Sequence, residues 1–205
     1  MNATTLDATA PTATAHGDGP VRIACAAGAL LALVPLALCS FSGDTGAEIT
    51  ASVRDDAAAL QGGAAAAALA GALLVVAALR LAASVPGLAG RVMAASGVAT
   101  AVLFVAYYAA FGAAGVTADH VVTDPGAGLG EATAALVNMA ELTRYAPGLA
   151  LAGAAVAGRR HLPAGVWIVA TVLAVATLVP FTSWGAALLV PLWLGVSAAV
   201  VRGRG

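Results

Sequence analysis

The strongest constraint on this chain is a series of apolar runs, each about 20 residues long and bounded by arginines or polar turns. About 20 consecutive apolar residues are what an α-helix needs to cross the hydrocarbon core of a bilayer. Only 9% of the 205 residues are charged, whereas a typical soluble domain has about 25%. The sequence therefore predicts an all-α fold, a polytopic bundle of transmembrane helices.

The runs predict six spans in one membrane domain. Residues 1–20 are rich in Ala and Thr and show no apolar periodicity, which indicates a disordered cytoplasmic tail. Residues 21–205 form the six-helix transmembrane domain, and no segment remains for a separate soluble domain. The spans are expected at about 21–42, 63–81, 92–116, 136–158, 163–181 and 184–201.

The first run could also be a cleaved export signal. A signal peptide carries positive charge before its apolar part, but the only charges before Arg22 are Asp7 and Asp18. The stretch 36–39 has the outline of a lipoprotein cleavage box, yet Leu38 stands where that box needs a small residue. Both observations favour an uncleaved first span, which Pro35 is expected to bend.

The first long polar connection, residues 43–62, contains Thr45 and Glu48 at the spacing of a helix capping box. Apolar residues then recur near helical spacing. This pattern predicts a short amphipathic helix on the membrane surface that ends at Gly62 and Gly63, with a plain solvated loop as the alternative.

The second long polar connection, residues 117–130, contains Asp119, His120 and Asp124. One histidine with two nearby acids is a weak metal signature, so we expect a solvated loop. No metal site and no cofactor are predicted anywhere in the chain.

Two packing features follow from small and polar residues. Gly63, Ala67 and Gly71 form a stripe that would allow another helix to approach the second span closely. Thr182 and Ser183 leave only a short turn between the last two runs, so these two helices are expected to form a tight antiparallel hairpin.

The arginines set the expected topology. If six spans alternate sides, seven of the nine arginines fall on one side, and only Arg54 and Arg144 fall on the other. An excess of arginine marks the cytoplasmic side. We therefore expect both termini in the cytoplasm. The seven are Arg22, Arg80, Arg91, Arg159, Arg160, Arg202 and Arg204.

The fourth run differs from the others because it contains both an acidic and a basic residue. At about 100° per residue, Asn138, Glu141, Arg144 and Tyr145 share one helix face. Glu141 and Arg144 are three residues apart, a spacing that permits an ion pair. Counting the helical rise back from residue 158 places Arg144 roughly 9 Å below the outer surface of a core about 30 Å thick.

This cluster has two interpretations. The pair can be an anchor whose side chains reach the outer interface and have no further role. Alternatively, charged residues within a span line a functional site, here a ligand-binding pocket open to the outside. Its candidate residues are Asn138, Glu141, Arg144 and Tyr145, with Tyr107 and Tyr108 from the neighbouring span.

Signatures of catalysis are missing from the sequence. No GxSxG elbow, HExxH pair, phosphate-binding loop or CxxC pair occurs. No catalytic residue is therefore assigned. A net charge of −1 gives no basic surface for nucleic acid, so no nucleic-acid partner is expected.

The Arg-flanked Ala/Val/Leu runs and the acidic connection at 43–62 resemble the small six-span integral membrane proteins of unknown function that are common in G+C-rich bacteria. The resemblance implies a multi-pass protein of the cell membrane, and it supplies no active site. The expected partners are the lipid bilayer and either another membrane protein or a second copy of the chain.

Three functional hypotheses follow. The favoured one is a non-enzymatic bundle that binds or stabilises a partner within the membrane. The second is a small-molecule carrier, or an accessory subunit of a transporter, with an outward-facing pocket at Glu141 and Arg144. The third, an intramembrane enzyme, has the least support.

Overall fold

The computed structural model describes residues 18–120, 126–179 and 183–201. Within these ranges, the side chains of residues 120, 126–127, 140–144, 183–184 and 187 lie outside the description. The predicted tail at 1–17 also lies outside it. The described residues contain helices and no strands, which confirms the all-α class.

The helices follow one another with short connections. They are α1 (Asp18–Leu31), α2 (Leu33–Leu38), α3 (Gly46–Asp55), α4 (Ala57–Ala83), α5 (Gly87–His120), α6 (Gly126–Ala157), α7 (Ala164–Leu178) and α8 (Ser183–Val200). Among the described residues, three helical segments are long and apolar enough to cross a membrane: Asp18–Leu38, Ala57–Ala83 and Gly87–Asp119. Three shorter apolar stretches are Tyr145–Ala157, Ala164–Leu178 and Leu188–Val200.

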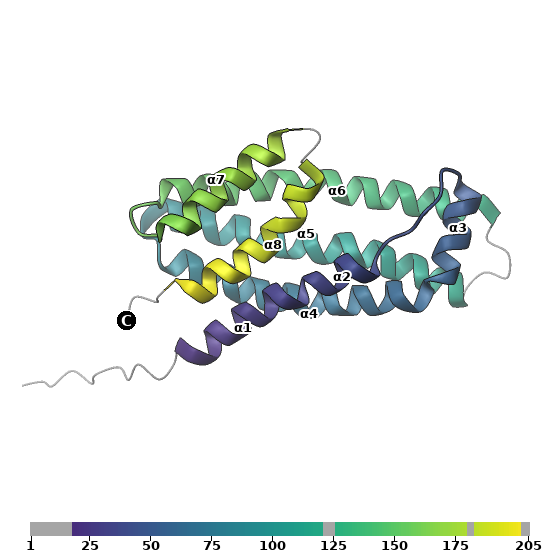
Figure 1. Cartoon of the computed structure of the whole chain (residues 1–205), viewed down its shortest axis with the longest axis horizontal. Helices are drawn as coiled ribbons and strands as arrows, with labels where there is room; N and C mark the ends of the chain where they lie inside the picture. The colour runs from purple at the N-terminus through teal and green to yellow at the C-terminus, as the bar shows by residue number, and fades with distance from the viewer. Residues whose placement is uncertain (1–17, 121–125, 180–182, 202–205) are drawn as a thin grey trace, which may run out of the picture.

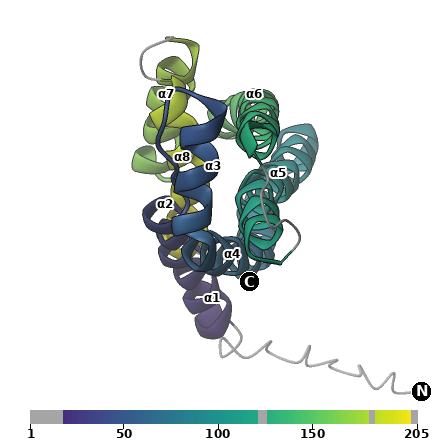
Figure 2. The same ribbon diagram turned by 90° about the vertical axis from the view of Figure 1, so that its right-hand side faces the viewer.

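The long helices α4, α5 and α6 run side by side along the long axis of the molecule, and α7 and α8 cover one side of them (Figure 1). Seen down that axis, α3 lies across one end (Figure 2). We call this end the acidic end, because its described charges include Asp44, Glu48, Asp55, Asp56, Asp119 and Glu131. The opposite, basic end carries Arg22, Arg80, Arg91, Arg159 and Arg160.

The first helical segment breaks where the sequence predicts it to bend. Pro35 has no N–H, and its ring clashes with the carbonyl four residues earlier. The segment accordingly divides at Ala32, whose N–H still donates to the Gly28 carbonyl at 3.0 Å. The helix begins at Asp18, three residues earlier than the expected span, and α2 ends at Leu38.

The capping box at the start of α3 is confirmed. The Glu48 N–H donates to Thr45 Oγ1 at 3.3 Å, and the Thr45 N–H donates to Glu48 Oε2 at 3.1 Å. The predicted end of this helix is wrong, since α3 stops at Asp55 and α4 starts at Ala57. Gly62 and Gly63 instead lie inside α4. Gly63 allows close packing there, since a Cβ at this position would collide with Sγ of Cys39, the residue that follows α2.

The connection between α5 and α6 is shorter than the polar residues suggest. Helix α5 continues to His120, and α6 starts at Gly126, ten residues before the expected span. Contact with α3 explains the early start of α6. The Gly130 N–H donates to Thr50 Oγ1 at 2.9 Å, and a Cβ at Gly130 would overlap the Gly46 carbonyl oxygen.

Small residues bring the helices close together, as the glycine stripe on α4 predicts. Ala67 is fully buried, and a Cβ at Gly71 would overlap Val105 of α5. Helices α7 and α8 contact each other directly, as the predicted hairpin requires (Figure 1). Residues 180–182 of its turn lie outside the described residues.

Candidate functional site

The two tyrosines assigned to the predicted pocket lie in the protein interior. Tyr107 and Tyr108 are 6% and 1% exposed. Their rings pack edge to face with centroids 4.9 Å apart, and they belong to an aromatic cluster with Phe104, Phe111 and Phe41. Such pairs stabilise a core through their edge-to-face geometry. The rings thus form the core of the acidic half of the bundle.

The pocket residues on α6 are divided between different environments. Asn138 is exposed, whereas its neighbour Val137 is buried in the same apolar cluster as Tyr107 and Tyr108. Tyr145 is half-buried. The side chains of Glu141 and Arg144 lie outside the described residues, although the backbone at both positions is helical.

No metal centre is found among the side chains that the structure describes, because no three His, Cys, Asp or Glu residues gather closely enough. Asp119 lies in the last turn of α5. The side chain of His120 and all of Asp124 lie outside the described residues.

Arg80 on α4 forms hydrogen bonds with α1 and with the C-terminal end of α8 at the basic end. Its guanidinium donates to both carboxylate oxygens of Asp18, with Nη2 to Oδ2 at 2.9 Å. It also donates to the carbonyls of Ala198 and Val201 at 2.8 and 3.0 Å. Arg22 Nε donates to the Ala199 carbonyl at 2.7 Å. The two arginines thus donate hydrogen bonds to carbonyls at the C-terminal end of α8, which have no partner within the helix.

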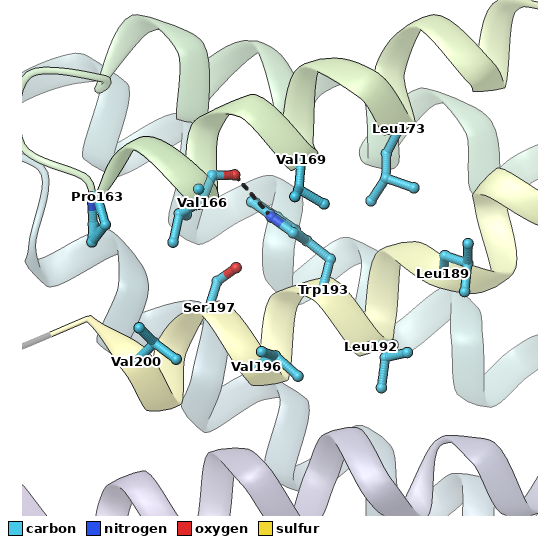
Figure 3. A pocket seen from close by; sticks show the side chains of 11 residues that line it. Pro163, Val166, Val169, Leu173, Leu189, Leu192, Trp193, Val196, Ser197 and Val200 are labelled. Atoms are coloured by element: carbon cyan, nitrogen blue, oxygen red, sulfur yellow. Dashed lines mark hydrogen bonds between the residues drawn. The ribbon is translucent and has the colours of Figure 1, made fainter.

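An apolar groove lies between α7 and α8 (Figure 3). Its volume is about 440 Å³, within the range of roughly 300–1,000 Å³ typical of ligand pockets. Ser197 is the single hydroxyl residue of its lining, so the groove favours an apolar occupant. The lining residues are Pro163, Gly165, Val166, Val169, Leu173, Leu189, Leu192, Trp193, Val196, Ser197 and Val200.

Trp193 forms the floor of this groove. Its indole Nε1–H donates to the Val166 carbonyl at 3.0 Å and so joins α8 to α7 across the groove (Figure 3). The side chain is buried, whereas Val169 and Val200 on the two walls are 46% and 56% exposed. The groove therefore has a buried, hydrogen-bonded floor and partly exposed walls.

The groove was not predicted from the sequence. The hairpin of α7 and α8 was predicted, but no function was assigned to it. Two signals point to the groove in retrospect. Trp193 is a large polar-tipped residue inside an apolar run, and Gly165 adds no side chain at the start of α7, where a Cβ would meet only open space.

The fold and this groove define the class of protein: an α-helical protein with several helices suited to a membrane and an apolar groove on its surface. Comparison of the chain with protein families, with curated proteins and with solved structures finds no match.

Proposed function

We propose that this chain is a non-enzymatic, six-span protein of the cell membrane that binds a hydrophobic partner within the bilayer. Both termini lie in the cytoplasm under this proposal. The six apolar helical stretches and the five described arginines at the basic end support the topology. The general type agrees with the six-span proteins that the sequence resembles.

The observation that carries the proposal is the α7–α8 groove. A carrier of polar solutes would need convergent polar groups, whereas this lining is apolar apart from Ser197 and the already bonded indole N–H of Trp193. Partly exposed Val169, Leu189 and Val196 would contact lipid if the groove were empty. Burial of their surface against a shaped partner adds dispersion contacts that fluid lipid gives less completely.

The proposal is tested by photocrosslinking in native membranes. A benzophenone amino acid replaces Val196 in the groove or Val172, which is exposed on α7 but does not line the groove. The expected result is one dominant adduct mass at position 196 and a broad range of bulk-lipid adducts at position 172. The same range at both positions would contradict selective binding in the groove.

A substitution that fills the groove provides a second test of the proposal in the same photocrosslinking experiment. Val169→Trp is expected to abolish the dominant adduct at position 196, because the larger side chain occupies the groove. Val172→Trp adds the same side chain outside the lining and should leave the adduct unchanged. Circular dichroism and thermal unfolding of both variants check that they fold.

A second candidate function, a carrier or transporter subunit with an outward-facing pocket, is favoured by the register of α6. At about 100° per residue, position 141 falls about 40° from Val137 and position 144 about 20° from Leu151. Both reference side chains are buried. The two charged positions thus share the helical spacing of these buried positions, whereas Asn138 of the same predicted cluster is exposed.

Charge removal tests this second candidate. If Glu141 and Arg144 pair within the protein, Glu141→Gln and Arg144→Gln should each cost about 3–5 kcal/mol, because each leaves a buried charge without its partner. The double variant should be less damaged than the sum of the two. Small and additive losses in detergent thermal stability would instead indicate an exposed anchor.

A further inference from the structure

The α7–α8 groove ends at the basic end of the molecule. Pro163 and Val200 close the lining at that end, and Leu173 and Leu189 mark the other end (Figure 3). The chain reaches Pro163 directly from the turn that holds Arg159, Arg160 and His161. The basic turn therefore leads directly into the first residue that lines the groove.

The length of the groove limits what can occupy it. From Pro163 to Leu173 the helical rise is about 15 Å, and from Leu189 to Val200 it is about 16 Å. The hydrocarbon core of a bilayer is about 30 Å thick, so the groove spans one leaflet. A transmembrane helix of a partner protein would pack along both leaflets. A groove of one-leaflet height fits a lipid acyl chain.

The basic turn next to Pro163, which we call the mouth of the groove, determines which lipid headgroup fits there. Arg159 and Arg160 are exposed and form no salt bridge with a described residue. Asp18 is the one acidic residue that the described chain places at the basic end, and Arg80 already pairs with it. No described acid competes at the mouth, so its charge complements an anion.

The end of α8 does not oppose this charge. The carbonyls at a helix C-terminus carry partial negative charge, but Arg80 and Arg22 donate to those of Ala198, Ala199 and Val201. Two residues lie between Arg160 and Pro163, so their Cα atoms are at most about 11 Å apart along the chain. The arginine can therefore reach a phosphate held above the groove.

We propose that the α7–α8 groove binds one acyl chain of an anionic glycerophospholipid of the cytoplasmic leaflet, with the headgroup phosphate against Arg159 and Arg160. This inference rests on the proposed function, because the six-span topology puts the basic end in the cytoplasm. Trp193 and Val166 form the floor beneath the acyl chain. The open first turn of α7 at Gly165 leaves space for the glycerol backbone of the lipid.

Native mass spectrometry of the full chain in mild detergent tests the assignment. The protein is titrated with phosphatidylglycerol and with phosphatidylcholine of identical acyl chains. We expect one phosphatidylglycerol to bind at least about tenfold more tightly than phosphatidylcholine, since two arginines near a phosphate each favour the anion. Arg159→Gln/Arg160→Gln should abolish this preference, and Val169→Trp should reduce binding of both lipids.

Matched controls separate the site from general surface charge. Arg91→Gln removes an exposed arginine at the same end but on α5, and Val172→Trp adds bulk outside the groove. Both should leave the preference and the stoichiometry unchanged. A loss of preference in Arg91→Gln equal to that in the double arginine variant would overturn the assignment.

Failure of this inference is distinguishable from failure of the proposed function. A dominant adduct at position 196 that is a protein or a neutral lipid, with equal affinity for the two lipids, overturns the anionic-lipid assignment and leaves the groove as a binding site. Identical adduct ranges at positions 196 and 172 overturn both.

Discussion

At the scale of single residues, Arg80 joins three parts of the described chain by hydrogen bonds. It sits on α4, is only 10% exposed, and bonds to Asp18 on α1 and to the end of α8. Asp18 is 44% exposed, so water screens its side of the pair. Arg80 therefore stabilises the fold mainly through its hydrogen bonds to carbonyls at the end of α8.

Arg80→Gln is expected to lower the free energy of unfolding by about 2 kcal/mol, because hydrogen bonds to a charged donor are lost at a partly buried site. Asp18→Asn should cost less than about 1 kcal/mol, as for other exposed pairs. Arg91→Gln, an exposed arginine at the same end, is the control. Thermal unfolding in detergent measures all three. Equal losses for Arg80→Gln and Asp18→Asn would contradict the role assigned to the α8 carbonyls.

Glu48 is the residue through which pH acts on α3. The backbone N–H groups of Asp44 and Thr45 donate to its carboxylate and hold the pKa of Glu48 below its ordinary value of 4.5. A group whose pKa is lower in the folded state stabilises the fold above its unfolded pKa. This contribution is lost as the pH falls through the folded pKa.

We therefore predict that amide hydrogen exchange in α3 accelerates below about pH 4 beyond the intrinsic change in exchange rate. Glu48→Gln removes the titrating group, so its α3 should exchange faster than the parent at neutral pH and lose the acid dependence. An unchanged acid dependence in Glu48→Gln would contradict this role of Glu48.

At the scale of elements, the contact between α4 and α5 depends on the absence of side chains. A Cβ at Gly97 would lie 2.7 Å from the Cβ of Ala78 and 3.4 Å from its Cα. Ala78 is fully buried and has no rotamer with which to move away. Helix separation is then the only way to accept a larger residue.

Gly97→Ala is expected to destabilise the protein by about 1–3 kcal/mol through overpacking. Gly153→Ala on α6 makes the same chemical change where a Cβ has nothing within 4 Å, so it should stabilise by up to about 1 kcal/mol through helix propensity. Thermal unfolding in detergent measures the opposite signs. Stabilisation by both substitutions would show that α4 and α5 are not tightly packed at Gly97.

At the scale of the whole molecule, much of the helical architecture could be predicted from the sequence, since long apolar runs require helices in a bilayer. The Pro35 break and the Thr45 capping box were also predictable, because both depend on local chemistry. The early start of α6 was not. It depends on the approach of Gly46 and Thr50 of α3 to Gly130, a contact 80 residues apart in the sequence.

The candidate sites were less predictable. Tyr107 and Tyr108 have the position of interfacial aromatics in the sequence, but side-chain packing with Phe104 and Phe111 places them in the core. The α7–α8 groove depends on how far Trp193 reaches towards Val166, which no periodicity encodes. The Glu141 and Arg144 pocket stays a prediction, since their side chains lie outside the described residues.

Under the proposed function, the chain crosses the membrane with its basic end in the cytoplasm. After Cys25 and Cys39 are replaced, a single cysteine is placed at Asp44 of the acidic end or at Leu88 of the basic end, both exposed. An impermeant thiol reagent applied to intact cells is expected to label position 44, and position 88 only after permeabilisation. Labelling of position 88 in intact cells, or protection of position 44, would contradict the claim.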